Sequence, residues 1–175
     1  MRSTILSAAL AVAAATAAPG GAAPAASDTV VVRLIDAKGE PVGTAALAAE
    51  NGGVRIRLSV RGLTPGEHGI HFHERGVCKP PDFTSAGGHF NPFGKKHGLL
   101  NPEGPHAGDL PNLVVGPDGR AEAIFFTPRV TLERGRPNSL LRPGDTALVI
   151  HEKRDDQRTD PTGNSGARVV CGEIR

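Results

Sequence analysis

The sequence predicts an all-β domain: an eight-stranded antiparallel Greek-key barrel or sandwich with two long functional loops. Short segments rich in β-branched residues recur along the chain, and turn-forming Gly, Pro, Asn and Asp residues separate them. After the first 26 residues, no helical period persists over ten residues. Many short strands with turns between them are typical of sandwiches and barrels.

The strand at residues 54–60 has the clearest pattern. Its Val, Ile, Leu and Val residues alternate with Arg, Arg and Ser, which predicts one buried face. Asn51, Gly52 and Gly53 precede it and favour a hairpin turn. In order, the predicted strands are residues 29–36, 42–50, 54–60, 68–74, 113–115, 121–127, 146–152 and 167–174.

Two segments between these strands are predicted to be long loops. Residues 75–111 show no sustained periodicity, and they are too dense in Gly and Pro for a helix to run through them. Residues 153–166 form a second, polar loop. Irregular segments of this kind are uncommon inside a compact domain and are usually functional.

The N-terminal segment, residues 1–26, is predicted to be a secretory signal peptide, which leaves a mature domain at 27–175. Arg2 precedes an apolar, mostly alanine stretch at 5–18, and small residues suited to cleavage follow. This stretch is too short for a confident membrane span, so none is expected in the mature form. An Ala-rich disordered N-terminus is the alternative, and the cleavage point stays open. The prediction is an exported protein, periplasmic or extracellular.

Charge and composition argue against a nucleic-acid partner. The formal net charge is +2, and removal of the segment that holds Arg2 lowers it to +1. A near-neutral chain lacks the basic footprint of a nucleic-acid-binding protein. Because Trp and Tyr are absent, base stacking would depend on six Phe residues and on His.

The chain has two cysteines, Cys78 and Cys171. In an exported protein such a pair suggests one disulfide, and two free buried thiols are the alternative. A metal-binding role is less expected because neither cysteine sits in a Cys-x-x-Cys pair.

Seven histidines occur, all between residues 68 and 151. His71 and His73 lie two residues apart in a predicted strand, so their imidazoles point to the same face and can bind one metal ion. His106 and Asp109 bring an imidazole and a carboxylate together in a turn, and both are ordinary zinc ligands. The other candidates are His89 and His97 in the long loop and His151 at the end of an apolar strand.

The number of candidate ligands fits two metal sites that share one residue. A four-imidazole site and a His/Asp site with one common ligand need seven residues, and six histidines with Asp109 supply them. A metal could also order this Gly- and Pro-rich loop. A flexible loop with incidental histidines is the alternative. Imidazole suits both copper and zinc, so the residue types alone do not choose the metals.

Several longer motifs occur in a fixed order along the chain. They are HGIHFHE at 68–74, SAGGHFNP at 85–92, KHG at 96–98, GPHAGDL at 104–110, VIHE at 149–152, the acidic pair at 155–156 and GNSGARVVCG at 163–172. With these motifs and Cys78, the sequence resembles the copper/zinc superoxide dismutase family, in its bacterial-type, secreted form. The similarity covers essentially all of residues 29–175.

The resemblance implies a copper ion and a zinc ion as cofactors. Asp155 would join a copper-site histidine to a zinc-site histidine, His71 and His97, and orient both. His68 would be structural and not a ligand. Copper would be held by His71, His73, His89 and His151, and zinc by His89, His97, His106 and Asp109, with the His89 imidazolate shared by both ions.

The resemblance also implies an enzyme, a superoxide dismutase that converts superoxide to oxygen and hydrogen peroxide by alternating copper reduction and oxidation. Arg168 would attract the anionic substrate, and His89 would carry a proton. Cys78 and Cys171 would form the family's disulfide. The loop at 153–166 is shorter than in better-known members, which leaves the strength of substrate steering open.

Two other hypotheses stay open on the sequence alone. One is a non-catalytic domain of the same fold that binds or delivers copper. Such domains usually lack a copper ligand or the arginine, and none is missing here. The other is a structural domain that holds zinc only. The oligomeric state is not readable from one sequence, and a homodimer is one of the assemblies considered.

Overall fold

The structure is a computed structural model that describes residues 29–175, so the signal peptide expected at 1–26 lies outside the described residues. No helix in residues 29–175 is long and apolar enough to cross a membrane. The elements are β1 (Val30–Asp36), β2 (Pro41–Glu50), β3 (Gly53–Arg61), β4 (Gly66–His68), β5 (Ile70–His73), a short 3-10 turn η1 (Thr84–Ala86), β6 (Leu113–Val115), β7 (Arg120–Thr127), β8 (Thr146–His151) and β9 (Arg168–Ile174).

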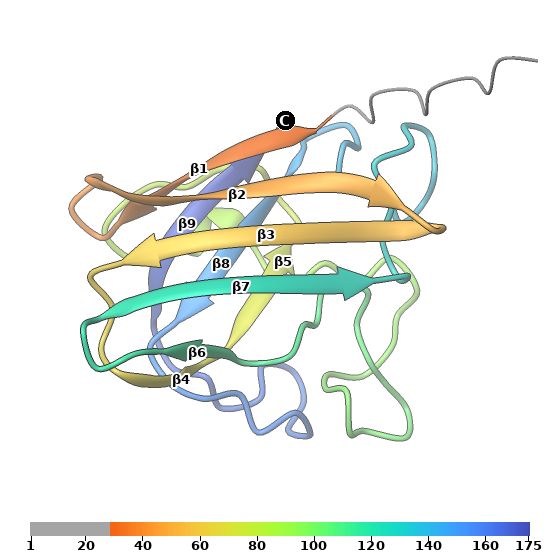
Figure 1. The fold of residues 1–175 in the computed structure, drawn as a ribbon. Helices are drawn as coiled ribbons and strands as arrows, with labels where there is room; N and C mark the ends of the chain where they lie inside the picture. The colour runs from red at the N-terminus through yellow and green to blue at the C-terminus, as the bar shows by residue number, and fades with distance from the viewer. Residues whose placement is uncertain (1–28) are drawn as a thin grey trace, which may run out of the picture.

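These strands form two antiparallel sheets. The larger has seven strands in the order β5-β8-β9-β1-β2-β3-β7, and the smaller pairs β4 with β6. The larger sheet curls, so that β5, β8 and β9 lie behind β2, β3 and β7 (Figure 1). The crossover order shows that β1 lies between β2 and β9, which are far apart in sequence.

The core lies inside this curl and follows from the alternation in the sequence. On β3, Val54, Ile56, Leu58 and Val60 are buried, whereas Arg57 and Ser59 are exposed. Burial of apolar side chains in this way contributes roughly 25 cal/mol per Å² of area removed from water. The same cluster includes Val32 and Leu34 of β1, Ile70 and Phe72 of β5, and Leu148 and Ile150 of β8.

One predicted strand is divided in two, so residues 29–175 form nine strands in place of the eight expected. His68 pairs with Leu113 in the small sheet, whereas Ile70 pairs with Ile150 in the large one. Between them, Gly69 donates its backbone N–H to Lys153 and accepts from His151. A Cβ at Gly69 would come within 2.8 Å of the Ser165 Cβ, so glycine permits this close approach.

A disulfide joins Cys78 to Cys171, with their Cα atoms 5.7 Å apart, as the sequence predicted. It attaches the start of the long loop to β9. A small second core forms around it, in which Phe83 and Ala86 pack against Val149. The bridge therefore fixes the segment around η1 on the outer side of β8 and β9.

We expect the double substitution Cys78→Ser and Cys171→Ser to lower the free energy of unfolding by about 2–5 kcal/mol, because the bridge closes a long loop of the unfolded chain. Urea denaturation of the metal-free protein measures this change. A loss below about 0.5 kcal/mol would show that the bridge does not constrain the chain as described.

Candidate metal centre

The long loop contacts β5 through paired backbone hydrogen bonds. The N–H of Phe90 donates to the carbonyl of Phe72, and the Phe72 N–H donates to the carbonyl of Gly108. A Cβ at Gly108 would lie 2.5 Å from the Phe72 carbonyl oxygen, so only glycine fits here. These contacts place His89 opposite His73 and Asp109 opposite His71. Distant loop residues thereby lie beside the strand.

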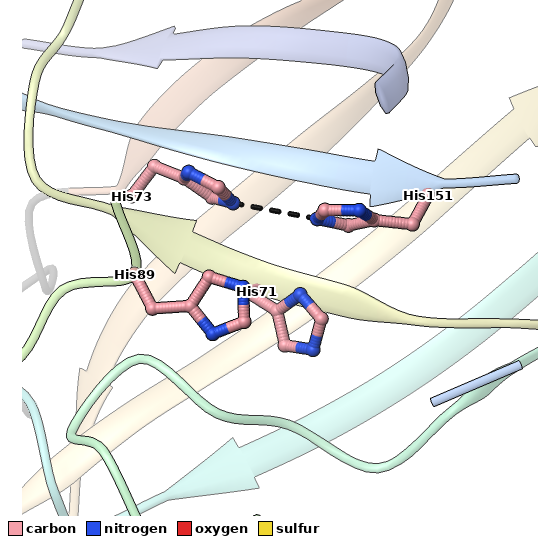
Figure 2. Close-up of side chains that lie close together, drawn as sticks. All are labelled: His71, His73, His89 and His151. Atoms are coloured by element: carbon pink, nitrogen blue, oxygen red, sulfur yellow. Dashed lines mark hydrogen bonds between the residues drawn. The ribbon is translucent and has the colours of Figure 1, made fainter. Parts of the chain in front are cut away.

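Four buried histidines form one group, called here the four-histidine group. A ligand-type nitrogen from each lies within 4.8 Å of the others, and the Nε2 atoms of His73 and His151 are 3.4 Å apart. The His71 and His89 rings stack with their centroids 4.0 Å apart. Figure 2 shows the side chains converging from β5, from the end of β8 and from the loop. The members are His71, His73, His89 and His151.

Three histidines and one aspartate form a second group, called here the Asp109 group. The Asp109 Oδ1 atom is 3.2 Å from the Nδ1 atoms of His89 and His97 and 3.4 Å from that of His106. Four ligand atoms bound tetrahedrally at zinc distances of 2.0–2.1 Å would be roughly 3.3 Å apart. The three distances thus match the edges of a tetrahedral zinc site.

His71 also lies within 4.8 Å of His89, His97 and Asp109. It fits the four-histidine group better nonetheless, because no nitrogen of His71 lies within 4.0 Å of an Asp109 oxygen, whereas one nitrogen of each of the other three histidines does. The Nδ1 of His106 lies close to Asp109 Oδ1 and has no hydrogen-bond partner of its own. His106 is therefore the better fourth member of the Asp109 group.

Four buried imidazole nitrogens have no hydrogen-bond partner in the described residues. They are the Nδ1 atoms of His71, His97 and His106 and the Nε2 atom of His89. Buried polar atoms without a partner are rare and costly in folded proteins. Each of these nitrogens belongs to one of the two groups, so the residues present fit metal ions bound at both.

Asp155 lies between the two groups and contacts both. Its carboxylate accepts from His71 Nε2 at 2.6 Å and from His97 Nε2 at 3.0 Å. The backbone N–H of Gln157 donates to it as well. Because the outer nitrogen of each ring is held, the inner Nδ1 atoms are turned towards the groups, which is how such carboxylates orient metal ligands.

Burial favours neutral imidazoles, the form that binds metal ions. It lowers the pKa of His89 and of His151 to about 3, and that of His73 well below its ordinary value. Burial alone would lower the pKa of His97 too, but the adjacent carboxylates of Asp109 and Asp155 outweigh it and raise that pKa to about 9. Burial would raise the pKa of both carboxyls, but the adjacent imidazoles, chiefly that of His106 for Asp109 and that of His71 for Asp155, hold it below the usual range.

Arg168 begins β9 and lies beside the four-histidine group. Its guanidinium donates to the carbonyls of Phe83 at 2.7 Å and Gly87 at 2.6 Å. The Gly87 carbonyl also accepts from His73 Nδ1, so one backbone oxygen connects the arginine to the group. Among residues 29–175, no carboxylate forms an ion pair with Arg168. Asp82 interacts with its charge electrostatically, without an ion pair within 4.0 Å.

His68 does not belong to either group. Its ring nitrogens lie 2.7 Å from the His151 carbonyl and 2.8 Å from the Thr64 carbonyl. It therefore connects the loop after β3 to the end of β8, the structural position that the sequence suggested. Sequence reasoning missed Asp160 and Gly163, whose contacts to the Asp109 group come from the second long loop.

A model of the copper/zinc superoxide dismutase family matches residues 42–174. The chain belongs to this family. It is 55% identical over 143 residues to a copper-zinc superoxide dismutase of Aquifex aeolicus, a match covering 81% of this chain and 84% of the relative. It is 43% identical over 152 residues to that of Caulobacter vibrioides, covering 85% and 86%.

Solved structures of the family share the fold. A SOD-like protein from Bacillus subtilis superposes with a TM-score of 0.81 at 45% identity, covering 83% of this chain and 97% of that one. The copper/zinc superoxide dismutase from Brucella abortus gives 0.69 at 31% identity, covering 85% and 100%. These comparisons confirm the predicted family and its Greek-key β-barrel fold. The chain is accordingly an oxidoreductase, a superoxide dismutase whose cofactors are copper and zinc.

We expect Gly163→Ala to weaken zinc binding by the metal-free chain at least tenfold. Gly163 has φ +65°, and a Cβ there would lie 2.6 Å from His97 Nε2, beside the Asp155 carboxylate. The added methyl group would push His97 Nε2 away from the Asp155 carboxylate that orients it. Zinc titration against a chelator measures the affinity. Gly135→Ala is the matched control, because Gly135 has φ +81° but open space around it. Equal zinc loss in both variants would contradict this explanation.

The metal-free chain should be most stable at about pH 6.5 and lose stability on either side. The lowered pKa values of His89 and His151 mean that their contribution is complete above the unfolded value of about 6.5 and is lost as pH falls towards 3. The raised pKa of His97 acts oppositely: its contribution is complete below about pH 6.5 and is lost as pH rises from there to about 9. Urea denaturation at pH 4, 7 and 10 tests this, and a stability that is highest at pH 4 would contradict it.

Proposed function

We propose that this superoxide dismutase works at the two groups joined by His89. The four-histidine group would hold copper and the Asp109 group would hold zinc, with His89 belonging to both. The observation that carries this proposal is the pair of ring nitrogens of His89. Its Nδ1 lies 3.2 Å from Asp109 Oδ1, and its buried Nε2 faces the other group without a partner.

In the overall reaction, two superoxide anions and two protons give one oxygen and one hydrogen peroxide. Bound copper supplies two accessible oxidation states, and bound zinc supplies positive charge without redox chemistry. The protein must therefore attract an anion, hold the ligand rings and deliver a proton. His89 Nε2 has no protein partner, so it is the atom proposed to carry a proton to the second superoxide.

Arg168 is proposed to bind the anion. Each of its two terminal nitrogens donates to one backbone carbonyl, and these two hydrogen bonds fix the orientation of the guanidinium. Its remaining N–H groups are left for a ligand. A fixed cation beside a partly buried site raises the local concentration of anions and their encounter rate. Asp155 has a different role, since it holds His71 and His97 in place and does not face the substrate.

The alternative, a domain that binds or delivers copper without turnover, has less support. All four histidines of the four-histidine group and Arg168 are present and lie together, as a catalytic site requires.

We propose that residues 1–26 direct export and that the domain at 27–175 functions in a periplasm or outside the cell. The disulfide supports this location, because such bonds persist in oxidising compartments. We also propose a homodimer, for which the exposed side chains of Ile124 and Phe126 on β7 offer an apolar contact surface. Sedimentation of the mature chain tests it, and a monomer at high micromolar concentration would contradict it.

We expect Arg168→Ala to lower superoxide turnover about tenfold or more while copper and zinc contents stay at the wild-type level, because the arginine binds substrate and not metal. His89→Ala should reduce the content of both metals. Arg154→Ala is a matched control, since Arg154 pairs with Glu67 at the surface. The test measures the copper and zinc content of each variant together with its superoxide turnover. A loss of copper in Arg168→Ala, or an equal drop in turnover in Arg154→Ala, would refute the assignment.

A further inference from the structure

The second long loop, residues 152–167, lies against the first and closes over the Asp109 group. The Gln157 carbonyl accepts from the Leu100 N–H at 3.0 Å, and the Arg158 carbonyl accepts from Asn101 Nδ2 at 3.2 Å. In Figure 1 the two loops lie at the same end of the barrel. A residue of the second loop can therefore act on ligands in the first.

Asp160 contacts two histidines of this group and the neighbouring Lys96. Its Oδ1 accepts from the backbone N–H of His97 at 2.8 Å, and its Oδ2 accepts from Lys96 Nζ at 3.2 Å. Its Oδ1 also lies 3.9 Å from His106 Nε2. The last distance is beyond a hydrogen bond, so the effect on His106 is electrostatic.

The position of Asp160 parallels that of Asp155. Asp155 contacts the outer nitrogen of His97, whose inner nitrogen faces Asp109. Asp160 lies beside the outer nitrogen of His106, whose inner nitrogen also faces Asp109. Among residues 29–175, no other carboxylate lies within 4.0 Å of that outer nitrogen. Each of these two rings thus has its own outer carboxylate, and both carboxylates come from one loop.

We propose that Asp160 is a positioning residue of the zinc site, a second outer carboxylate that works beside Asp155. It fixes the backbone of His97 by a hydrogen bond and makes the His106 ring a stronger ligand by placing negative charge at its outer N–H. This inference rests on the proposed zinc site. Outer carboxylates of this kind typically change metal affinity 10–100-fold. The lower end is expected here, because the Asp160 side chain is 36% exposed and salt screens it.

The test is zinc titration of the metal-free chain in competition with a chromophoric chelator, at low and high salt. Asp160→Ala should weaken zinc binding about tenfold. The zinc affinity of Asp160→Asn should lie between those of Asp160→Ala and wild type, because an amide oxygen can still accept a hydrogen bond from the His97 N–H. The difference between Asp160→Asn and wild type should shrink at high salt. Cobalt(II) in the zinc site gives a second readout, since its visible absorption bands report ligand geometry and should shift in Asp160→Ala.

Asp156→Asn is the matched control. Asp156 belongs to the same loop, and its carboxylate accepts hydrogen bonds from Thr159 and Asn164. Among residues 29–175, it forms no hydrogen bond with a histidine of either group. Its zinc affinity should stay within twofold of wild type, and its cobalt spectrum should not change. Equal weakening in Asp156→Asn and Asp160→Ala would show that only loop closure matters and would overturn the proposal.

The outcomes also separate this inference from the function on which it rests. If wild type binds zinc tightly and Asp160→Ala binds it equally well, the role of Asp160 is wrong and the zinc site stands. If the wild-type chain itself takes up no zinc, the proposed zinc site fails and the role of Asp160 fails with it.

Discussion

The burial of four imidazole nitrogens without protein partners is the constraint on which the rest of the centre depends. A buried polar atom left unsatisfied costs about 1–3 kcal/mol. Such a cost is large beside the whole stability of an ordinary domain, about 5–15 kcal/mol. Metal binding can offset it, since structural zinc contributes about 10–16 kcal/mol in small domains. The centre is thus suited to binding metal ions, and the carboxylates of Asp109 and Asp155 hold its imidazole rings in place through their own contacts.

The barrel and the loops divide the task of holding this centre. Strands β5 and β8 carry His71, His73 and His151 on a packed frame, whereas the other ligands lie on a loop without regular structure. That loop is ordered by backbone contacts to β5, by the disulfide and by the second long loop. Arg168 depends on the same arrangement, because the segment held by the disulfide supplies the carbonyls that fix it. The proposed anion site at Arg168 and the proposed metal sites therefore depend on the same loop contacts.

Much of this could be read from the sequence, for identifiable physical reasons. Alternation on β3 gave the buried face, and the spacing of His71 and His73 placed both rings on one face of a strand. The division at Gly69 was missed, because an unbroken run of strand-forming residues does not reveal that its two halves pair with different sheets. Nothing in the sequence distinguishes Asp160 from the other charged residues of the polar loop at 153–166. Its contact with His97 joins residues 63 positions apart, and no local pattern encodes such a contact.

The most direct test of the central claim is the metal content of the purified mature chain, residues 27–175, measured beside its superoxide turnover after loading with copper and zinc. Two groups that share His89 predict one copper and one zinc per chain, with turnover that depends on the copper. Uptake of zinc alone, or binding of both metals without turnover, would contradict the account.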